Sequence, residues 1–136
     1  VVKIIDVFPE YFGYNDVDIY AENDAPNTYP MGGYEMLVRA EIFRGRYRNS
    51  YENPSAFTPN KIEEEKFELP SIAPTFKQGH RLMVQIQRSW FPVADRNPQQ
   101  LIDIYHCDEK DSIKSDIKIW HDAEQASKII LHVLNK

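Results

Sequence analysis

The sequence predicts an all-β fold, either an antiparallel β-sandwich or a jelly roll. Apolar residues alternate with period two in several short stretches, and segments rich in Pro, Asn, Asp and Gly separate these stretches. The composition, with Tyr 8, Phe 7 and Pro 9, also favours strands and turns. A chain of 136 residues suits one domain, so we expect residues 1–136 to form a single unit of about six strands.

Two strands are predicted in the first part of the chain. Residues 1–8 are apolar on both faces except at Lys3 and Asp6, which is typical of a central strand, and Pro9 ends the run. Residues 34–43 alternate strictly, with an apolar face and a mixed face. This second pattern indicates a half-buried strand.

Three further strands are predicted in the rest of the chain, the one at 82–86 by the same alternation. Residues 82–86 alternate after Gly79, which supplies a turn conformation. Residues 62–69 are crowded with charge, as edge strands are when they avoid pairing with other sheets. In residues 113–119, Ile alternates with Lys and Asp, which again indicates a strand.

The pattern of residues 122–136 fits two structures. Apolar residues spaced three and four apart fit a helix, while alternate apolar residues over 129–133 fit a strand face. Asp122 with Gln125 three residues later is a helix-start signal. The residues alone therefore favour a helix here.

The charge and composition argue against several classes of partner. The net charge of −5 opposes nucleic-acid binding, and no apolar run is long enough to span a membrane. Cys107, the single cysteine, has no partner for an internal disulfide, and the compartment stays open. The chain starts inside a predicted strand without Met, which we interpret as a fragment of a longer protein.

No catalytic motif stands out in the sequence. None of the seven serines lies in Gly-x-Ser-x-Gly, the turn that presents a nucleophile in α/β-hydrolases. The histidines lie outside any recognisable nucleophile–base arrangement, so we expect structural or surface roles for them. They are His80, His106, His121 and His132.

Metal and cofactor sites are not expected either. His106 and Cys107 are adjacent but lack the further ligands that zinc requires. An acidic group between Pro9 and Gly33 offers oxygen ligands of the kind calcium prefers, but without the spacing of an EF-hand loop, so we interpret it as a solvated loop. The group consists of Asp16, Asp18, Glu22 and Asp24.

Two clusters are candidates for a docking surface. Arg44, Arg46 and Arg48 alternate along one segment and, in an acidic chain, favour salt bridges or docking over phosphate binding. Trp90 and Phe91 follow a predicted strand, where large aromatic side chains either cap a core or anchor an interface.

Five segments together resemble the C-terminal domain of the superfamily of X-Pro dipeptidyl-peptidases, cocaine esterases, α-amino-acid ester hydrolases and cephalosporin acylases. The segments, in chain order, are Val2 to Pro9, Met31 to Arg39, Arg44 to Tyr51, Phe76 to Ile86 and Ser89 to Pro98. The last one, Ser89-Trp90-Phe91-Pro92 followed by Asp95-Arg96-Asn97-Pro98, is the most specific. The resemblance is nearer to the ester hydrolase and acylase branch than to the X-Pro peptidases.

This resemblance implies a non-catalytic, galactose-binding-like jelly roll that follows an α/β-hydrolase domain with a helical cap. The Ser, Asp and His triad then lies upstream of Val1. The family's sandwich has strands before the Val1 segment, so the chain is expected to lack its first strands. The family's domain also ends in a strand, and we therefore expect a strand rather than a helix at 129–134. The implied partners are the hydrolase and cap domains of the parent chain, with a homo-oligomer as a further option.

On this interpretation the docking corner consists of Trp90, Phe91, Arg96 and Asn97, with Arg44, Arg46 and Arg48 as polar partners. One alternative is a carbohydrate-binding module that uses Trp90 or Tyr34 as a platform. Another is a separate enzyme that uses His80 or His106 as a base. The substrate of the parent, whether an X-Pro peptide, an amino-acid ester or a β-lactam amide, stays open.

Overall fold

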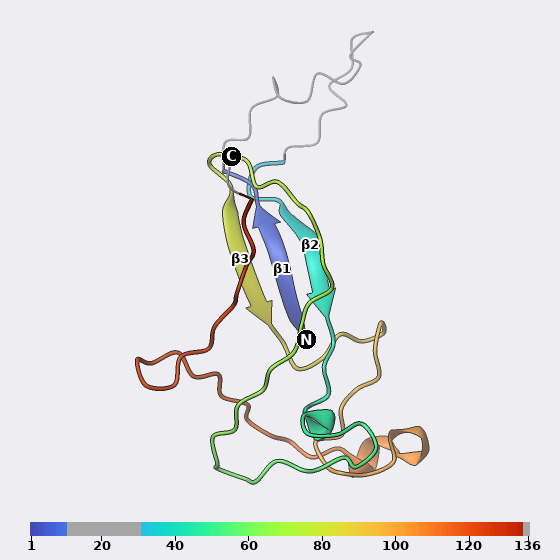
Figure 1. Cartoon of the computed structure of the whole chain (residues 1–136). Helices are drawn as coiled ribbons and strands as arrows, with labels where there is room; N and C mark the ends of the chain where they lie inside the picture. The colour runs from blue at the N-terminus through green and yellow to red at the C-terminus, as the bar shows by residue number, and fades with distance from the viewer. Residues whose placement is uncertain (11–30, 135–136) are drawn as a thin grey trace, which may run out of the picture.

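The computed structural model describes residues 1–10 and 31–134, with a three-stranded antiparallel sheet at its centre (Figure 1). The strands are β1 (Val2–Val7), β2 (Glu35–Glu41) and β3 (Arg81–Ile86), in the order β2-β1-β3. Short 3-10 helices occur at η2 (Gly45–Tyr47), η3 (Ile104–His106) and η4 (Glu109–Asp111). The described residues form no α-helix, and the predicted all-β class is confirmed.

Strand β1 carries the buried core of the sheet. Ile4, Ile5 and Val7 are buried, together with Asp6, so both faces of the strand are covered. The sequence predicted this central position because residues on both faces of β1 are apolar. The prediction for β1 is confirmed by its pairing with β2 on one side and β3 on the other.

A β-bulge changes the predicted face pattern of β2. Ile5 pairs with Leu37 and Ile4 pairs with Arg39, so Val38 is an extra residue between two successive pairs. A bulge breaks strict alternation because two residues then oppose one. The prediction that residues 34–43 alternate strictly between two faces is therefore wrong. The bulge places Arg39 opposite Ile4.

The turn before β3 forms as predicted. Gly79 has a φ of +83°, in the left-handed region that glycine adopts without steric cost. The His80 N–H donates to the Lys77 carbonyl at 3.1 Å and closes the turn. His80 therefore lies directly before β3, the strand that pairs with β1.

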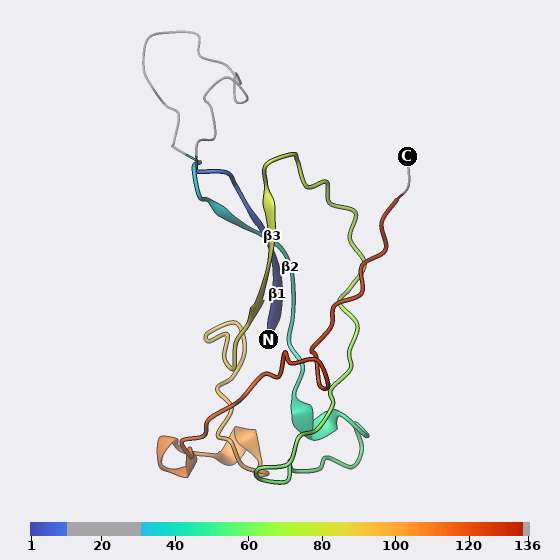
Figure 2. The same cartoon turned by 90° about the vertical axis from the view of Figure 1, so that its left-hand side faces the viewer.

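Three predicted strands are not formed by the described residues. Segments 62–69, 113–119 and 129–134 are not assigned as strands, because no ladder of backbone hydrogen bonds joins them to another described segment. Figure 2 shows the chain near residues 62–76 and 128–134 on the same side of the sheet, as a second layer. The two-layer arrangement suits a sandwich, and the jelly-roll connectivity stays a prediction.

The helix favoured at 122–136 is also absent from the described residues. Asp122 does accept the Gln125 N–H at 2.7 Å, as a cap would. However, the Ser127 N–H and hydroxyl both donate to the Trp120 carbonyl, which folds residues 120–127 into a loop. The cap contact of Asp122 is therefore present, but the chain from Trp120 to Ser127 closes a loop where the helix was predicted.

The predicted acidic group Asp16, Asp18, Glu22 and Asp24 lies outside the described residues. No helix in the described part of the chain is long and apolar enough to cross a membrane.

Candidate functional site

The predicted docking corner is a loop that leaves β3 and folds back on itself. Its residues are 90–97, and the Ala94 N–H donates to the Trp90 carbonyl at 3.0 Å. The Trp90 ring is partly buried, and Lys3 Nζ lies 4.7 Å from its centroid. This cation–π contact attaches the corner to the central strand β1.

The tip of the docking corner exposes apolar side chains. Phe91 is 59% exposed and Val93 is 65% exposed. The guanidinium of Arg96 lies over the Phe91 ring, with Cζ 4.7 Å from the centroid. An aromatic ring stacked under an arginine is the combination that recurs at the centres of protein interfaces.

Polar contacts hold the base of the corner. Arg44 reaches Asp95 at 3.7 Å, a loose ion pair with an exposed carboxylate. Asn97 accepts the Gln99 N–H on its side-chain oxygen at 3.1 Å. A hollow of about 40 Å³ lies between Arg44 and Trp90, and that volume has room for water but not for a substrate.

Arg46 connects two distant parts of the chain. Its Nη1 donates to the Ile102 carbonyl and its Nη2 to the Gln100 carbonyl, both at 2.9 Å. The planar guanidinium fork suits this pair of parallel carbonyl contacts. Arg46 therefore joins η2 to the segment that precedes η3.

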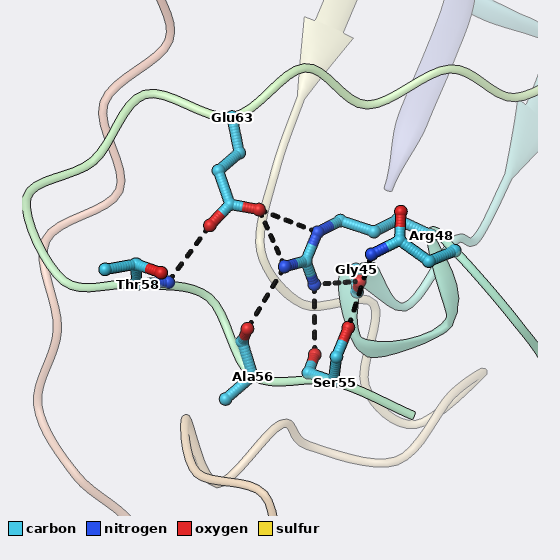
Figure 3. Close-up of polar contacts among 7 residues, drawn as sticks. Gly45, Arg48, Ser55, Ala56, Thr58 and Glu63 are labelled. Carbon is cyan, nitrogen blue, oxygen red and sulfur yellow. Dashed lines mark hydrogen bonds and ion pairs between the residues drawn. The ribbon is translucent and has the colours of Figure 1, made fainter. Parts of the chain in front are cut away.

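Arg48 uses all of its donors inside the chain (Figure 3). Its Nε donates to Glu63 Oε2 at 2.9 Å, and Nη2 lies 2.6 Å from the same oxygen. The remaining donors go to backbone carbonyls, those of Gly45, Ser55 and Ala56. Of the three arginines predicted as docking partners, Arg44 is the one that contacts the corner, through Asp95. A docking role for Arg46 and Arg48 stays a prediction.

The carboxyl of Glu63 has a pKa below its usual value. The backbone N–H of Thr58 donates to Oε1 at 3.0 Å and is the main cause, while the hydrogen bond from Arg48 adds to it. Both contacts favour the ionised carboxylate. Ionised Glu63 therefore stabilises the folded loop 45–63.

The loop should lose stability in acid through Glu63. A lowered folded pKa contributes stability that is present above the ordinary value of 4.5 and lost as pH falls through the folded value. We expect Glu63→Gln to weaken protection of the Ser55 amide at pH 7 and to weaken it less at pH 3. Amide hydrogen exchange in the full-length parent, corrected for the pH dependence of chemical exchange, measures this difference. An equal difference at both pH values would contradict the assignment.

Two histidine–aspartate pairs occur in contrasting surroundings. His80 Nδ1 lies 2.9 and 3.0 Å from the two carboxylate oxygens of Asp6, and both side chains are almost fully buried. His106 Nδ1 lies 2.6 Å from Asp103 Oδ2, and both are exposed. The bond from His106 is the main cause that lowers the pKa of Asp103.

Sequence reasoning identified the histidines but missed their carboxylates. Asp103 and His106 have the i, i+3 spacing, which was a usable signal. Asp6 and His80 lie on different strands, and no local pattern connects them. Cys107, next to His106, donates its thiol to the Ile104 carbonyl rather than to the imidazole.

The remaining candidate groups are dispersed. His121 and His132 are exposed. Within residues 1–10 and 31–134, no group of three or more His, Cys, Asp or Glu side chains is arranged to hold a metal ion.

Comparison with known proteins identifies the family. Residues 1–130 match the model of the family described as the X-Pro dipeptidyl-peptidase C-terminal non-catalytic domain. The chain belongs to this family. The resemblance seen in the sequence is thereby confirmed.

Two relatives place this X-Pro dipeptidyl-peptidase C-terminal domain within much longer proteins. Cocaine esterase of Rhodococcus sp. (strain MB1 Bresler) is 30% identical over 95 residues, which are 70% of this chain and 13% of that protein. A solved selenomethionine-labelled α-amino acid ester hydrolase is 42% identical with a TM-score of 0.68, over 82% of this chain and 16% of that chain. The chain thus spans less than a fifth of each relative.

Proposed function

We propose that this non-catalytic domain packs on the α/β-hydrolase domain of a longer serine hydrolase and helps to enclose its active site. Residues 1–136 then belong to one jelly-roll domain, and the docking corner at 90–97 is the contact surface. The observation that carries the proposal is the exposed pair Phe91 and Val93, presented beside Arg96 on an anchored loop.

The physical basis is the cost of leaving such a tip in water. A fully buried phenylalanine side chain gains about 1.5–3 kcal/mol relative to an exposed one. A loop attached to β1 through Lys3 and Trp90 presents the ring with little further ordering entropy. The corner therefore suits a docking surface of fixed orientation.

The chemistry proposed for the parent is acyl transfer through a covalent ester. The named relatives are an esterase and an ester hydrolase, and the family is that of the X-Pro dipeptidyl-peptidases. These names support an amide or ester of an α-amino acid, or an X-Pro peptide, as the substrate class. The catalytic serine, histidine and aspartate are then supplied by the hydrolase domain. This chain contributes the shape of the enclosure rather than a reacting group.

Three observations favour docking over sugar binding. A sugar platform needs an open aromatic face, but Lys3 lies over the Trp90 ring. Tyr34, the other platform candidate, makes an edge contact with Phe8 at 5.7 Å between centroids. Phe91, the exposed ring, already carries Arg96.

Alanine at Trp90 or Arg96 in the full-length parent should lower kcat/KM by roughly tenfold or more, as loss of an interface anchor does. Steady-state kinetics with an amino-acid ester substrate measures the effect. The control is Tyr105→Ala, because Tyr105 is 84% exposed on η3 and lies outside the corner residues 90–97. Unchanged stability and activity in both corner variants would rule out the assignment.

A further inference from the structure

The docking corner has a local charge opposite to that of the whole chain. The sequence has a net charge of −5. Four cationic side chains nevertheless lie at or beside residues 90–97, namely Lys3, Arg44, Arg88 and Arg96. Among the described residues that line the hollow between Arg44 and Trp90, the one carboxylate is that of Asp95. Positive charge therefore exceeds negative charge at this surface, which favours a partner surface that carries carboxylates.

Arg96 is a cation of the corner that has no counter-ion within the described chain. Its guanidinium lies over the Phe91 ring, with Cζ 4.7 Å from the centroid, and the residue is exposed. Across residues 1–10 and 31–134 it makes neither an ion pair nor a hydrogen bond. The ring contact is a cation–π interaction, so the N–H donors of the guanidinium remain available for a partner.

The arginines that precede the corner in sequence have acceptors inside the chain. Arg44 contacts Asp95 at 3.7 Å. Arg46 and Arg48 donate to backbone carbonyls, and those bonded to Arg46 lie at 2.9 Å. The unused fork of Arg96 is a planar set of donors of the kind that binds both oxygens of a carboxylate.

Docking of the corner would remove Arg96 from water together with the apolar tip. In Figure 2 the chain that leaves β3 loops out on the side of the sheet opposite the second layer, so that layer does not cover it. Phe91 and Val93 are 59% and 65% exposed, and Arg96 lies on the first of them. A surface that covers both apolar side chains therefore also takes water from the guanidinium. A buried charge without an opposite charge is strongly unfavourable, so the partner surface must supply one.

We propose that the docking corner binds an aspartate or glutamate side chain of the hydrolase domain, whose carboxylate pairs with Arg96 beside Phe91. Apolar side chains of that domain surround the carboxylate and cover Phe91 and Val93. Lys3 holds the corner through the Trp90 ring, so Arg96 meets the carboxylate in a fixed orientation. The inference rests on the proposed docking function and adds the chemistry of the surface that the corner recognises.

Photo-crosslinking in the full-length parent identifies the surface that contacts the corner. Val93 is replaced with p-benzoylphenylalanine in an equal mixture of isotopically light and heavy enzyme. We expect light–light and heavy–heavy crosslinks to a peptide outside residues 1–136 that contains an aspartate or glutamate. The same group at Tyr105 is the control and should not label that peptide. Light–heavy crosslinks, which indicate a second copy, or crosslinks confined to residues 1–136 would overturn both the docking function and this inference.

A charge exchange then tests the ion pair separately from docking. Arg96→Glu should lower kcat/KM of the parent roughly tenfold or more, and arginine in place of the acidic residue of the crosslinked peptide should restore it to within about threefold. Arg88→Glu is the matched control, because it makes the same charge change beside the corner, and the same partner exchange should not restore it. Crosslinks outside residues 1–136 without restoration at any acidic position would overturn the carboxylate and leave the docking function intact. Equal restoration of both variants would also overturn it, because the general charge of the surface would then explain the effect.

Neutral substitutions give the same test if Arg96→Glu does not fold. Arg96→Gln and the matching amide at the acidic position should each lower kcat/KM. If the two side chains pair, the double variant should lose less than about twofold beyond the weaker single variant. Losses that multiply in the double variant would show that the side chains do not pair, and would overturn the proposal.

Discussion

Replacing Asp6 with alanine should lower the local stability of the sheet by about 3–5 kcal/mol, the cost of breaking a buried ionisable pair. Asp6 and His80 face each other at 2.9 and 3.0 Å with 4% and 3% of their side chains exposed. Removal of the carboxylate leaves the imidazole buried without this partner. Amide exchange of Val2–Val7 in the full-length parent should accelerate by roughly a hundred-fold or more.

The chain contains a matched control for this prediction. Asp103→Ala removes the same type of contact from His106, but there the side chains are 57% and 83% exposed. Exposed ion pairs contribute little because water screens and replaces them. We expect no measurable change in the amide exchange of Val2–Val7 for Asp103→Ala. Equal effects of the two variants would show that burial does not explain the contribution of the Asp6–His80 pair.

Arg48→Lys should open the loop 45–63 despite the conserved charge. Lysine cannot reproduce the planar fork that reaches Glu63 and three backbone carbonyls together. Some backbone carbonyls then lose their donors, and the charge-assisted bond to Glu63 weakens. Together these losses should lower the free energy of opening the loop by about 2–4 kcal/mol. Exchange of the Ser55 amide, bonded to the Arg46 carbonyl at 2.8 Å, measures the opening.

Arg44→Lys is the control for the charge alone. Among the described residues, the guanidinium of Arg44 makes one ion pair, at 3.7 Å with the exposed Asp95, and a flexible ammonium can replace it. The loop should keep its protection in this variant. Similar losses in Arg44→Lys and Arg48→Lys would show that charge, rather than the fork geometry, maintains the loop.

The sequence predicted elements whose stability is local or strongly apolar. Strand β1 could be assigned because apolar residues on both faces require neighbours on both sides. The turn at Gly79 could be assigned because glycine alone adopts its φ freely. The bulge at Val38 could not, since its register depends on how β2 meets β1 and no residue type specifies it.

The candidate site was predictable in composition but not in contacts. Trp90 and Phe91 were identified as an aromatic corner, and the structure gives their partners as Lys3 and Arg96. The arginines looked equivalent in sequence, but Arg48 meets Glu63 because the loop 49–62 folds back. Segments 62–69 and 129–134 have the apolar pattern of strands, but the described residues form no ladder with them. A sequence pattern does not show which segment would pair with a strand.

The sheet order has a consequence for how the protein is made. Strand β1 is synthesised first of the three, yet its neighbours arrive much later, since Val2 pairs with Glu41 on one side and with Ile86 on the other. Contacts so distant in sequence are slow to form, because the intervening chain loses entropy before they are gained. At the ribosome, Ile4, Ile5 and Val7 therefore stay uncovered until β3 has emerged, and during that interval the nascent chain is a substrate for chaperones that bind exposed apolar segments.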